Sequence, residues 1–267
     1  MTILGSQMTK IYRAYTRLAE VYDLKGHDRF SVQMVEYTFK LLKKFRFRPR
    51  RILDLCCGTG TAAVMFAEQG YDVTGLDGSR EMLAVAKKKA MKKKVKIELL
   101  HERLPDFEIR ERKNHLRRFD LITCYFDSLN YILKEDELRG AFRSVAKHLR
   151  PGGLFIFDMN TARALQFLWG DKTYAGIKPG IAWIWESLYY NRAHQADLRA
   201  TCFVKKGKQW ETFEEIHSEK AYSNSAIKEG LHSAHFEILA FYDCFKFRKP
   251  DKRSNRIAVV ARIRPKG

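Results

Sequence analysis

Short apolar runs alternate with helix-like segments through the first half of the chain, and this alternation restricts the fold more than any other feature. The runs occupy residues 51–55, 72–76, 95–100, 119–125 and 153–158. Helical periodicity between them covers residues 61–69, 80–91 and 135–149. Most of the runs are nearly continuously apolar, as is typical of strands covered on both faces. The alternation therefore predicts a parallel sheet with right-handed crossovers.

The segments before residue 51 and after residue 160 have a different pattern of apolar and polar residues. Residues 8–23 and 30–45 have helical periodicity, and Pro49 ends the second of these segments. After residue 165, aromatic-rich or alternating stretches separated by short polar turns predict an antiparallel meander. These stretches are residues 182–190, 196–205 and 209–217. A helix at 224–234 and two strands at 236–246 and 256–263 are expected to follow.

These elements predict an α/β protein with a seven-stranded, mostly parallel sheet, a C-terminal β-hairpin and a small inserted antiparallel β meander. Residues 1–164 are expected to form N-terminal helices and the ligand-binding core. Residues 165–222 would be the inserted antiparallel substrate lid, and residues 223–267 would complete the core with a helix and the hairpin.

The segment ILDLCCGTGT at residues 52–61 places an acid and a glycine turn at the end of a buried strand. Ligands of open α/β sheets bind beyond the carboxyl ends of the strands. Gly58 and Gly60 let the backbone approach a ligand closely. Asp77 ends the next strand, at a distance suited to a carboxylate that accepts both hydroxyls of a ribose. The pattern predicts a nucleoside-containing ligand.

Two ligand classes fit this turn. Gly58, Gly60 and Ala63 satisfy G-x-G-x-x-A, which also suits NAD or FAD. Asp54 favours the second class, represented by S-adenosylmethionine, because a carboxylate beside the turn would repel the pyrophosphate of NAD or FAD. S-adenosylmethionine has no phosphate and carries an ammonium and a sulfonium. The structural alternative is that Asp54 merely caps the turn or the next helix.

Four segments in order resemble the motif set of class I (Rossmann-like) S-adenosylmethionine-dependent methyltransferases. They are ILDLCCGTGT, GYDVTGLDGSREML, RRFDLITCYFDSLNYI and AFRSVAKHLRPGGLFIFDMNT. The N-terminal YTRLAEVYD and the inserted lid are similar to a bacterial small-molecule subgroup, which is related to aminosugar and glycine or sarcosine N-methyltransferases. The resemblance implies methyl transfer to a nitrogen or oxygen of a small molecule, with S-adenosylhomocysteine as product.

The resemblance assigns site residues position by position. It implies that the following residues bind the cofactor: Tyr15, Tyr22, Asp54, Cys56, Gly58, Gly60, Asp77, Gly78, Ser79, Met82, Tyr125, Phe126 and Asp127. Tyr15 and Tyr22 would close over it. Asp127 and Tyr131 are the candidate catalytic residues by position, should the acceptor arrive protonated.

Two departures from the family pattern matter. Its first glycine is Cys56 here, which would slightly narrow the turn. The usual Asp that meets the adenine amino group is not evident, and His101, Glu102 or Arg103 would take its place.

The formal net charge of +19 attracts polyanions and leaves an RNA methyltransferase as an alternative. Seven lysines within residues 87–96 could bind phosphate, but we favour a solvated helix end and its loop as their explanation. An NAD-dependent oxidoreductase and a non-catalytic nucleoside-binding protein are further alternatives. Neither the five cysteines nor the eight histidines form a metal pattern, and no apolar run is long enough to span a membrane. We expect a cytoplasmic protein with no metal site.

Overall fold

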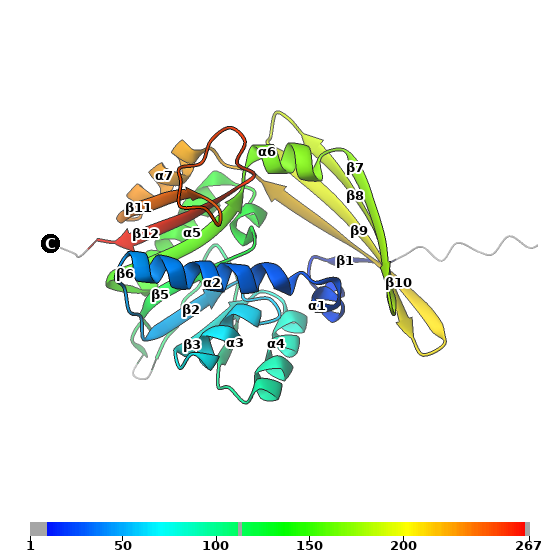
Figure 1. The fold of residues 1–267 in the computed structure, drawn as a ribbon, viewed down its shortest axis with the longest axis horizontal. Helices are drawn as coiled ribbons and strands as arrows, with labels where there is room; N and C mark the ends of the chain where they lie inside the picture. Colours follow the sequence, from blue (N-terminus) through cyan, green and yellow to red (C-terminus); the bar gives the residue numbers. More distant parts are fainter. Residues whose placement is uncertain (1–9, 112–113, 265–267) are drawn as a thin grey trace, which may run out of the picture.

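The computed structural model describes residues 10–111 and 114–264, which form two β-sheets and the helices around them (Figure 1). The seven-stranded sheet has the order β11-β12-β6-β5-β2-β3-β4. Its strands are β2 (Arg51–Leu55), β3 (Asp72–Asp77), β4 (Glu98–His101), β5 (Phe119–Cys124), β6 (Leu149–Asn160), β11 (Phe236–Asp243) and β12 (Arg256–Ile263). Strands β2 to β6 are parallel, and β12 runs antiparallel to both β6 and β11. The predicted α/β sheet with its C-terminal hairpin is confirmed.

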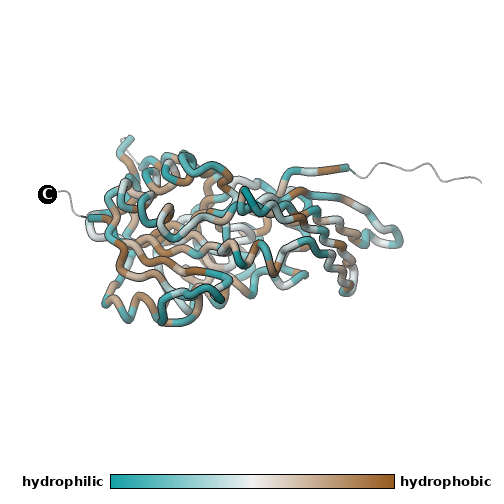
Figure 2. The backbone as a smooth tube through the Cα atoms, turned by 90° about the horizontal axis from the view of Figure 1, so that it is seen from above, coloured by the Kyte–Doolittle hydropathy of each residue, from teal (hydrophilic) through white to brown (hydrophobic). Residues whose placement is uncertain are grey.

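Both faces of this sheet are covered by helices, which explains the continuous apolar runs in its strands. The helices are α2 (Asp28–Lys44), α3 (Thr61–Glu68), α4 (Arg80–Lys93), α5 (Glu135–His148) and α7 (Asn224–Ser233). Leu53 and Phe155 point to the face that packs against α5 and α7. Their neighbours Ile52 and Leu154 point to the opposite face, against α2 and α3. In Figure 2 the apolar segments concentrate in this part of the molecule.

The second sheet has five strands in the order β1-β10-β9-β8-β7 and stands beside the first (Figure 1). Its strands are β1 (Ile11–Arg13), β7 (Lys172–Lys178), β8 (Ile181–Tyr190), β9 (Gln195–Lys206) and β10 (Gln209–Lys220). Strands β7 to β10 form an antiparallel meander, and β1 joins β10 in parallel. We call these five strands the lid sheet. Short helices α6 (Ala162–Ala164) and η4 (Leu165–Trp169) lead into it from β6.

The structure corrects the expected helix at residues 8–23, of which residues 8 and 9 lie outside the described part. The segment instead forms β1, a 3-10 turn η1 (Leu18–Glu20) and a short helix α1 (Tyr22–Lys25). Tyr15 has a left-handed backbone, with φ of 64°, which a continuous helix cannot contain. The amides of Tyr15, Arg17 and Leu18 donate to the side chain of Glu215 in β10 rather than to carbonyls one turn back. A contact 200 residues away along the chain therefore overrides the local periodicity.

Other boundaries shift by a few residues. Strand β7 was not among the predicted elements, β6 begins four residues before the expected 153, and β11 ends at Asp243 rather than 246. Within residues 10–111 and 114–264, no helix has both the length and the apolar composition needed to span a bilayer.

Candidate functional site

The site begins at the turn between β2 and α3, where the backbone is left-handed at three positions. Cys56, Gly58 and Gly60 have φ values of 53°, 54° and 74°. Glycine adopts this conformation without a steric cost, whereas a side chain does not. A Cβ on Gly60 would also lie 2.7 Å from the Cβ of Ala86 in α4. The turn therefore brings backbone amides close to the carboxyl end of β2.

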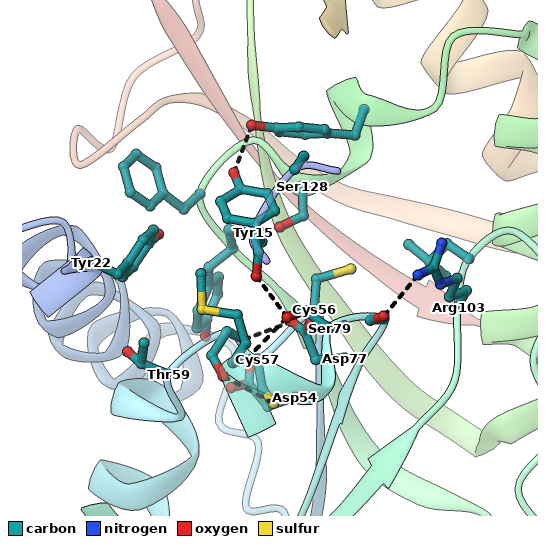
Figure 3. Close-up of a pocket in the computed structure, with 18 of the residues that line it drawn as sticks. Tyr15, Tyr22, Asp54, Cys56, Cys57, Thr59, Asp77, Ser79, Arg103 and Ser128 are labelled. Carbon is teal, nitrogen blue, oxygen red and sulfur yellow. Dashed lines mark hydrogen bonds between the residues drawn. The ribbon is translucent and has the colours of Figure 1, made fainter. Parts of the chain in front are cut away.

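A cavity of ≈ 350 Å³ opens at this turn, and we call it the first cavity (Figure 3). It lies beyond the carboxyl ends of β2, β3 and β5, where ligands of such sheets bind. The residues of the predicted cofactor set that line it are Tyr15, Tyr22, Asp54, Cys56, Gly58, Asp77, Gly78, Ser79, Met82, Tyr125 and Phe126. The structure thus brings together all of the predicted cofactor residues except Gly60 and Asp127.

Four acids line the first cavity, Asp54, Asp77, Glu81 and Glu102, and the first two are the most deeply buried. Oδ1 of Asp54 accepts a hydrogen bond of 2.8 Å from the Thr123 hydroxyl, while Oδ2 is buried and finds no partner among the described residues. Burial, with a smaller contribution from the charge of Asp77, raises the pKa of Asp54 to about 7. Asp77 accepts 2.8 Å hydrogen bonds from the amides of Gly58 and Ser79, and burial raises its pKa. The wall of the cavity near Asp54 therefore contains a carboxyl oxygen without a partner among the described residues.

The N-terminal segment covers the first cavity through Tyr15. The carbonyl of Tyr15 accepts a 2.7 Å hydrogen bond from the hydroxyl of Ser79, which also caps α4. The phenol of Tyr15 donates to the hydroxyl of Tyr131 at 2.6 Å, and its ring packs edge-on against Tyr22 (Figure 3). Tyr15 therefore connects the segment after β1 to the cofactor side and to the residues after β5.

The structure separates the three candidates for the adenine contact. Glu102 and Arg103 line the first cavity, whereas His101 does not. His101 and Arg103 both contact the carbonyl of Gly78 at 3.1 Å. The Glu102 side chain makes no hydrogen bond within the described residues, so its carboxylate is free to accept one from a ligand.

A second cavity, of ≈ 430 Å³, lies between the first cavity and the lid sheet. Tyr15, Tyr22, Phe126 and Tyr131 line both cavities. The lid sheet and the segment leading into it add an aromatic part of the wall, at Trp169, Tyr174, Trp183 and Trp185. A molecule in the second cavity would therefore lie against the same residues as a molecule in the first.

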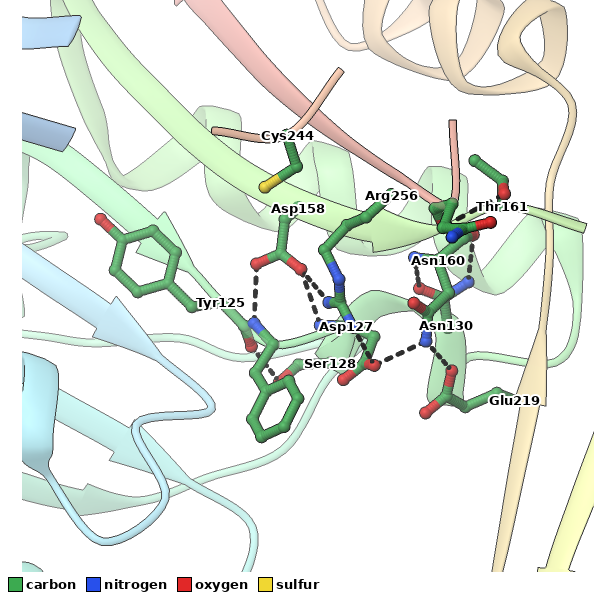
Figure 4. Close-up of polar contacts among 12 residues, drawn as sticks. Tyr125, Asp127, Ser128, Asn130, Asp158, Asn160, Thr161, Glu219, Cys244 and Arg256 are labelled. Carbon is green, nitrogen blue, oxygen red and sulfur yellow. Dashed lines mark hydrogen bonds and ion pairs between the residues drawn. The ribbon is translucent and has the colours of Figure 1, made fainter. Parts of the chain in front are cut away.

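A buried polar network forms the floor of the second cavity (Figure 4). Arg256 of β12 pairs with Asp127 at 2.8 Å and with Asp158. The amide of Asn160 donates to Asp127 at 2.6 Å and to Glu219 at 2.8 Å. Asp127 thus lines the second cavity rather than the first, where it was predicted. Burial, and then the negative charge of Asp127, raises the pKa of Glu219 well above its ordinary value.

Glu215, His217 and Glu219 were not predicted as site residues. All three are buried, and they occupy alternate positions of β10, so that they share one face of the strand. The signal was present as E-x-H-x-E at residues 215–219, although the predicted strand, 209–217, ended two residues before Glu219. Burying acid and histidine side chains on one face of a strand costs folding free energy, so such a set is typical of a functional site.

Comparisons with known proteins agree with this geometry. The family model described as "Methyltransferase domain" matches residues 52–153. A protein of Geobacillus sp. (strain WCH70) named as a methyltransferase is 33% identical over 251 residues, covering 93% of this chain and 99% of that protein. The dTDP-3-amino-3,4,6-trideoxy-alpha-D-glucopyranose N,N-dimethyltransferase of Streptomyces venezuelae is 33% identical over 148 residues, covering 52% of this chain and 56% of that protein. The crystal structure of an S-adenosylmethionine-dependent methyltransferase from Clostridium acetobutylicum ATCC 824 has a TM-score of 0.82 at 28% identity, and covers 93% of this chain and 98% of that chain.

Proposed function

Because this chain belongs to the class I S-adenosylmethionine-dependent methyltransferases, we propose that it methylates the nitrogen of a small-molecule amine held in the second cavity. Family membership makes the protein an enzyme of class EC 2.1.1.- with S-adenosylmethionine as cofactor. It sets aside the oxidoreductase and the non-catalytic alternatives. The nitrogen acceptor and the roles of individual residues are the proposal.

The residues of the first cavity fit the cofactor. The buried, unpartnered Oδ2 of Asp54 suits the ammonium of the methionine end, and Asp77 suits the ribose hydroxyls. Of the three residues that could replace the family's usual Asp, Glu102 is the one that we propose for the adenine amino group, because it lines the cavity with a carboxylate. When bound, the cofactor supplies a methyl group already activated by a positively charged sulfur. The protein then needs mainly to align the acceptor and exclude water.

The acidic floor of the second cavity is the observation that carries the proposal for an amine. The guanidinium of Arg256 pairs with Asp127 and Asp158, whereas the nearby carboxyl group of Glu219 is hydrogen-bonded to Asn160. Glu219 has no ion-pair partner among the described residues, although it is only 1% exposed. A cationic amine would supply the missing positive charge, whereas a neutral hydroxyl would not.

The aromatic wall supports the same class of acceptor. Trp183 and Trp185 line the cavity, and aromatic rings attract cations and flat apolar groups. The Lys25 ammonium already lies 4.6 Å and 3.4 Å from the centres of these two rings, and His27 stacks on Trp185. The Streptomyces venezuelae relative is named for an amino-sugar nucleotide whose nitrogen it methylates. We propose an acceptor of that general kind, with an amine next to an apolar or planar body.

Three of the lining residues have distinct roles in this proposal. Tyr131 stands at the junction of the cavities and would align the acceptor nitrogen. Asp127 is bound to Arg256 and Asn160, so it would hold negative charge in place rather than accept a proton. Tyr15 would close the junction against water.

The experiment is a two-step assay on the purified protein. Calorimetry with S-adenosylmethionine should show binding. Release of S-adenosylhomocysteine is then measured with benzylamine, glycine, 3-amino-3-deoxyglucose, their hydroxyl analogues and bulk RNA. We expect turnover with at least one amine and none with its hydroxyl analogue. Turnover with RNA and with no amine would reject the proposal in favour of the basic surface.

Glu219→Gln tests the acidic floor directly. Loss of the carboxylate removes a charge-assisted contact, so KM for the amine should rise about tenfold, with little change in the Kd of S-adenosylmethionine. Glu237→Gln is the matched control, because Glu237 is exposed on β11. An unchanged KM in Glu219→Gln would contradict the assignment.

A further inference from the structure

A chain of four polar side chains crosses the boundary between the cavities. The Tyr15 hydroxyl donates to the Tyr131 hydroxyl at 2.6 Å, and the Tyr131 hydroxyl lies 3.0 Å from Nδ1 of His217. Nε2 of His217 lies 3.2 Å from Oε2 of Glu215. The four residues come from the segment after β1, from η3 (Ser128–Tyr131) and from β10.

The distances fit one arrangement of protons. If Tyr15 donates to Tyr131, the oxygen of Tyr131 is an acceptor and its proton points to Nδ1 of His217. The neutral ring then carries its proton on Nε2, on the side of Glu215. The Nε2–Glu215 contact lacks the geometry of a hydrogen bond within the described residues, so it is primarily a contact between a charge and a ring. Every donor in the chain then points toward Glu215, and the Tyr15 oxygen is left with a free lone pair at the cavity junction.

Glu215 is suited to remain a negative charge at the end of this chain. It is fully buried, and its carboxylate accepts from the amides of Tyr15, Arg17 and Leu18 at 2.6, 2.6 and 2.8 Å. Three amide donors stabilise the ionised form of a carboxylate. The same contacts hold Tyr15, the first of the four hydrogen-bonded side chains, in place.

On this basis we infer that His217, supported by Glu215, is the final proton acceptor for the incoming amine, reached through the hydroxyls of Tyr15 and Tyr131; the inference rests on the proposed function. An amine in water carries a proton and has no lone pair for the methyl group. The N–H bond of the ammonium breaks and its proton passes to the Tyr15 oxygen. The proton of Tyr15 passes to Tyr131, and that of Tyr131 to Nδ1 of His217.

Bonds, protons and charges all balance in this scheme. The free amine forms its bond to carbon as the bond from carbon to sulfur breaks, and the product nitrogen carries the positive charge that the sulfur loses. The imidazolium of His217 is paired with the Glu215 carboxylate until the product leaves, when it returns its proton to water. No oxidant, reductant or other co-reactant is required.

Three other groups that face His217 have roles of their own. Asp127 is engaged by Arg256. Glu219, which accepts from Asn160, is the proposed counter-charge of the amine, so Glu219→Gln should raise KM and leave the pH-dependent contribution of His217 to kcat in place. His27, which precedes α2, lines the same cavity, but burial and the nearby charge of Lys25 lower its pKa to about 4. Burial also raises the pKa of Tyr15 and of Tyr131 well above the ordinary value, so both hydroxyls keep a proton to pass on.

The first test needs no methyl acceptor. Two-bond ¹H–¹⁵N spectra of the full chain report which ring nitrogen of a histidine carries the proton, and His217→Gln assigns the signal. We expect a neutral ring protonated on Nε2 at pH 7, with an Nδ1 signal that shifts in Tyr131→Phe. A ring protonated on Nδ1 would overturn the inference, because that nitrogen could then accept no proton.

The second test uses turnover of benzylamine, or of the best amine of the screen. His217→Gln keeps a group that can hydrogen-bond to Tyr131, yet kcat at pH 7 should fall about 100-fold, while KM and the Kd of S-adenosylmethionine change little. The deficit should then shrink as the pH rises toward the pKa of the amine, because free amine no longer needs a base. A deficit that is equal at every pH would indicate a structural role and overturn the inference.

His194→Asn is the matched control. His194 forms a similar contact, 3.2 Å from its Nδ1 to the Tyr189 hydroxyl, but on the exposed side of the lid sheet. Its backbone is left-handed, which Asn tolerates. Normal activity is expected. If no amine is methylated at all, the proposed function fails in the screen, and the proton position on His217 still decides the inference.

Discussion

Asp54 combines deep burial with an oxygen that lacks a partner in the described part of the chain. It lines the first cavity and is only 2% exposed, and its buried Oδ2 makes no hydrogen bond there. Leaving a carboxylate in this condition is costly, and the cost appears as a pKa raised to about 7. The ligand-free fold therefore holds this group partly protonated near neutral pH, although a cation would bind only the ionised form.

The first prediction concerns the pH dependence of cofactor binding. Affinity for S-adenosylmethionine should fall about tenfold between pH 8 and pH 6, because the Asp54 carboxyl gains a proton in this interval. The same raised pKa means that the ligand-free fold loses stability as the pH rises from about 4 through about 7. Calorimetric titration at several pH values measures the affinity.

Asp54→Asn should bind the cofactor weakly and with a flat pH profile over this range. Asp136→Asn, at an exposed position of α5, should behave like the wild type. A steep profile that persists in Asp54→Asn would show that another group, such as Asp77 with its raised pKa, governs the titration.

At the scale of single elements, the turn between β2 and α3 depends on glycine for two separate reasons. Gly60 has a left-handed backbone, and its α-carbon closely faces Ala86 of α4. Gly152, in the turn within β6, has a similar φ of 78° but open space around it. The two positions therefore separate the backbone requirement from the packing requirement.

The second prediction uses this pair. Gly60→Ala should lower the free energy of unfolding by about 2–4 kcal/mol, since backbone strain and overpacking add. Gly152→Ala should cost about 1 kcal/mol, from strain alone. Denaturant unfolding of both variants measures the difference. Equal losses would mean that α4 moves away from the added methyl group at no cost.

The sequence was most informative where local periodicity decides the element. The alternating strands and helices between residues 51 and 160 bury complete faces, and their spacing predicted them to within a few residues. Strand β7 lacks such a pattern. Its sequence KTYAGIK includes Gly176, which lies so close to Trp183 of β8 that a Cβ there would be 2.3 Å from the indole. Only knowledge of the neighbouring strand explains that residue.

In residues 10–20, even a clear local pattern predicts the wrong element. Their apolar spacing suits a helix, but the Glu215 carboxylate takes three of their amide protons and β10 provides a strand partner. The motif positions of the candidate site were predictable because they follow strands in order. The contribution of the lid sheet was not, because it depends on which face of β10 turns toward the core.

At the scale of the whole molecule, the network around Arg256 connects the two sheets. Asp127 follows β5, Asp158 and Asn160 belong to β6, and Glu219 belongs to the lid sheet. Asn160 donates to both Asp127 and Glu219, so its amide joins the core to the lid (Figure 4). Loss of the guanidinium would leave several carboxyl groups buried together without a counter-charge.

The third prediction follows from this arrangement. Arg256→Met should reduce the free energy of unfolding by about 3–5 kcal/mol at pH 7, as expected when one partner of a buried ion pair is removed. The loss should be smaller at pH 5, where the remaining carboxyl groups can take up protons more readily. Urea unfolding at both pH values measures it.

Arg248→Met provides the comparison. Arg248 pairs with Asp243 and Asp251, but its side chain is 53% exposed, so the expected cost is about 0–1 kcal/mol. Similar losses in the two variants would show that the Arg256 network is no more important for stability than a surface ion pair.

The position of Tyr15 has a kinetic consequence for the enzyme. Its carbonyl holds Ser79 on the side of the first cavity, while its ring and hydroxyl form part of the second. The proposed acceptor site is thus complete only when residues 10–20 lie over the first cavity. Such a construction favours an ordered sequential scheme, in which the methyl donor enters before the acceptor and the demethylated nucleoside is the last product to depart.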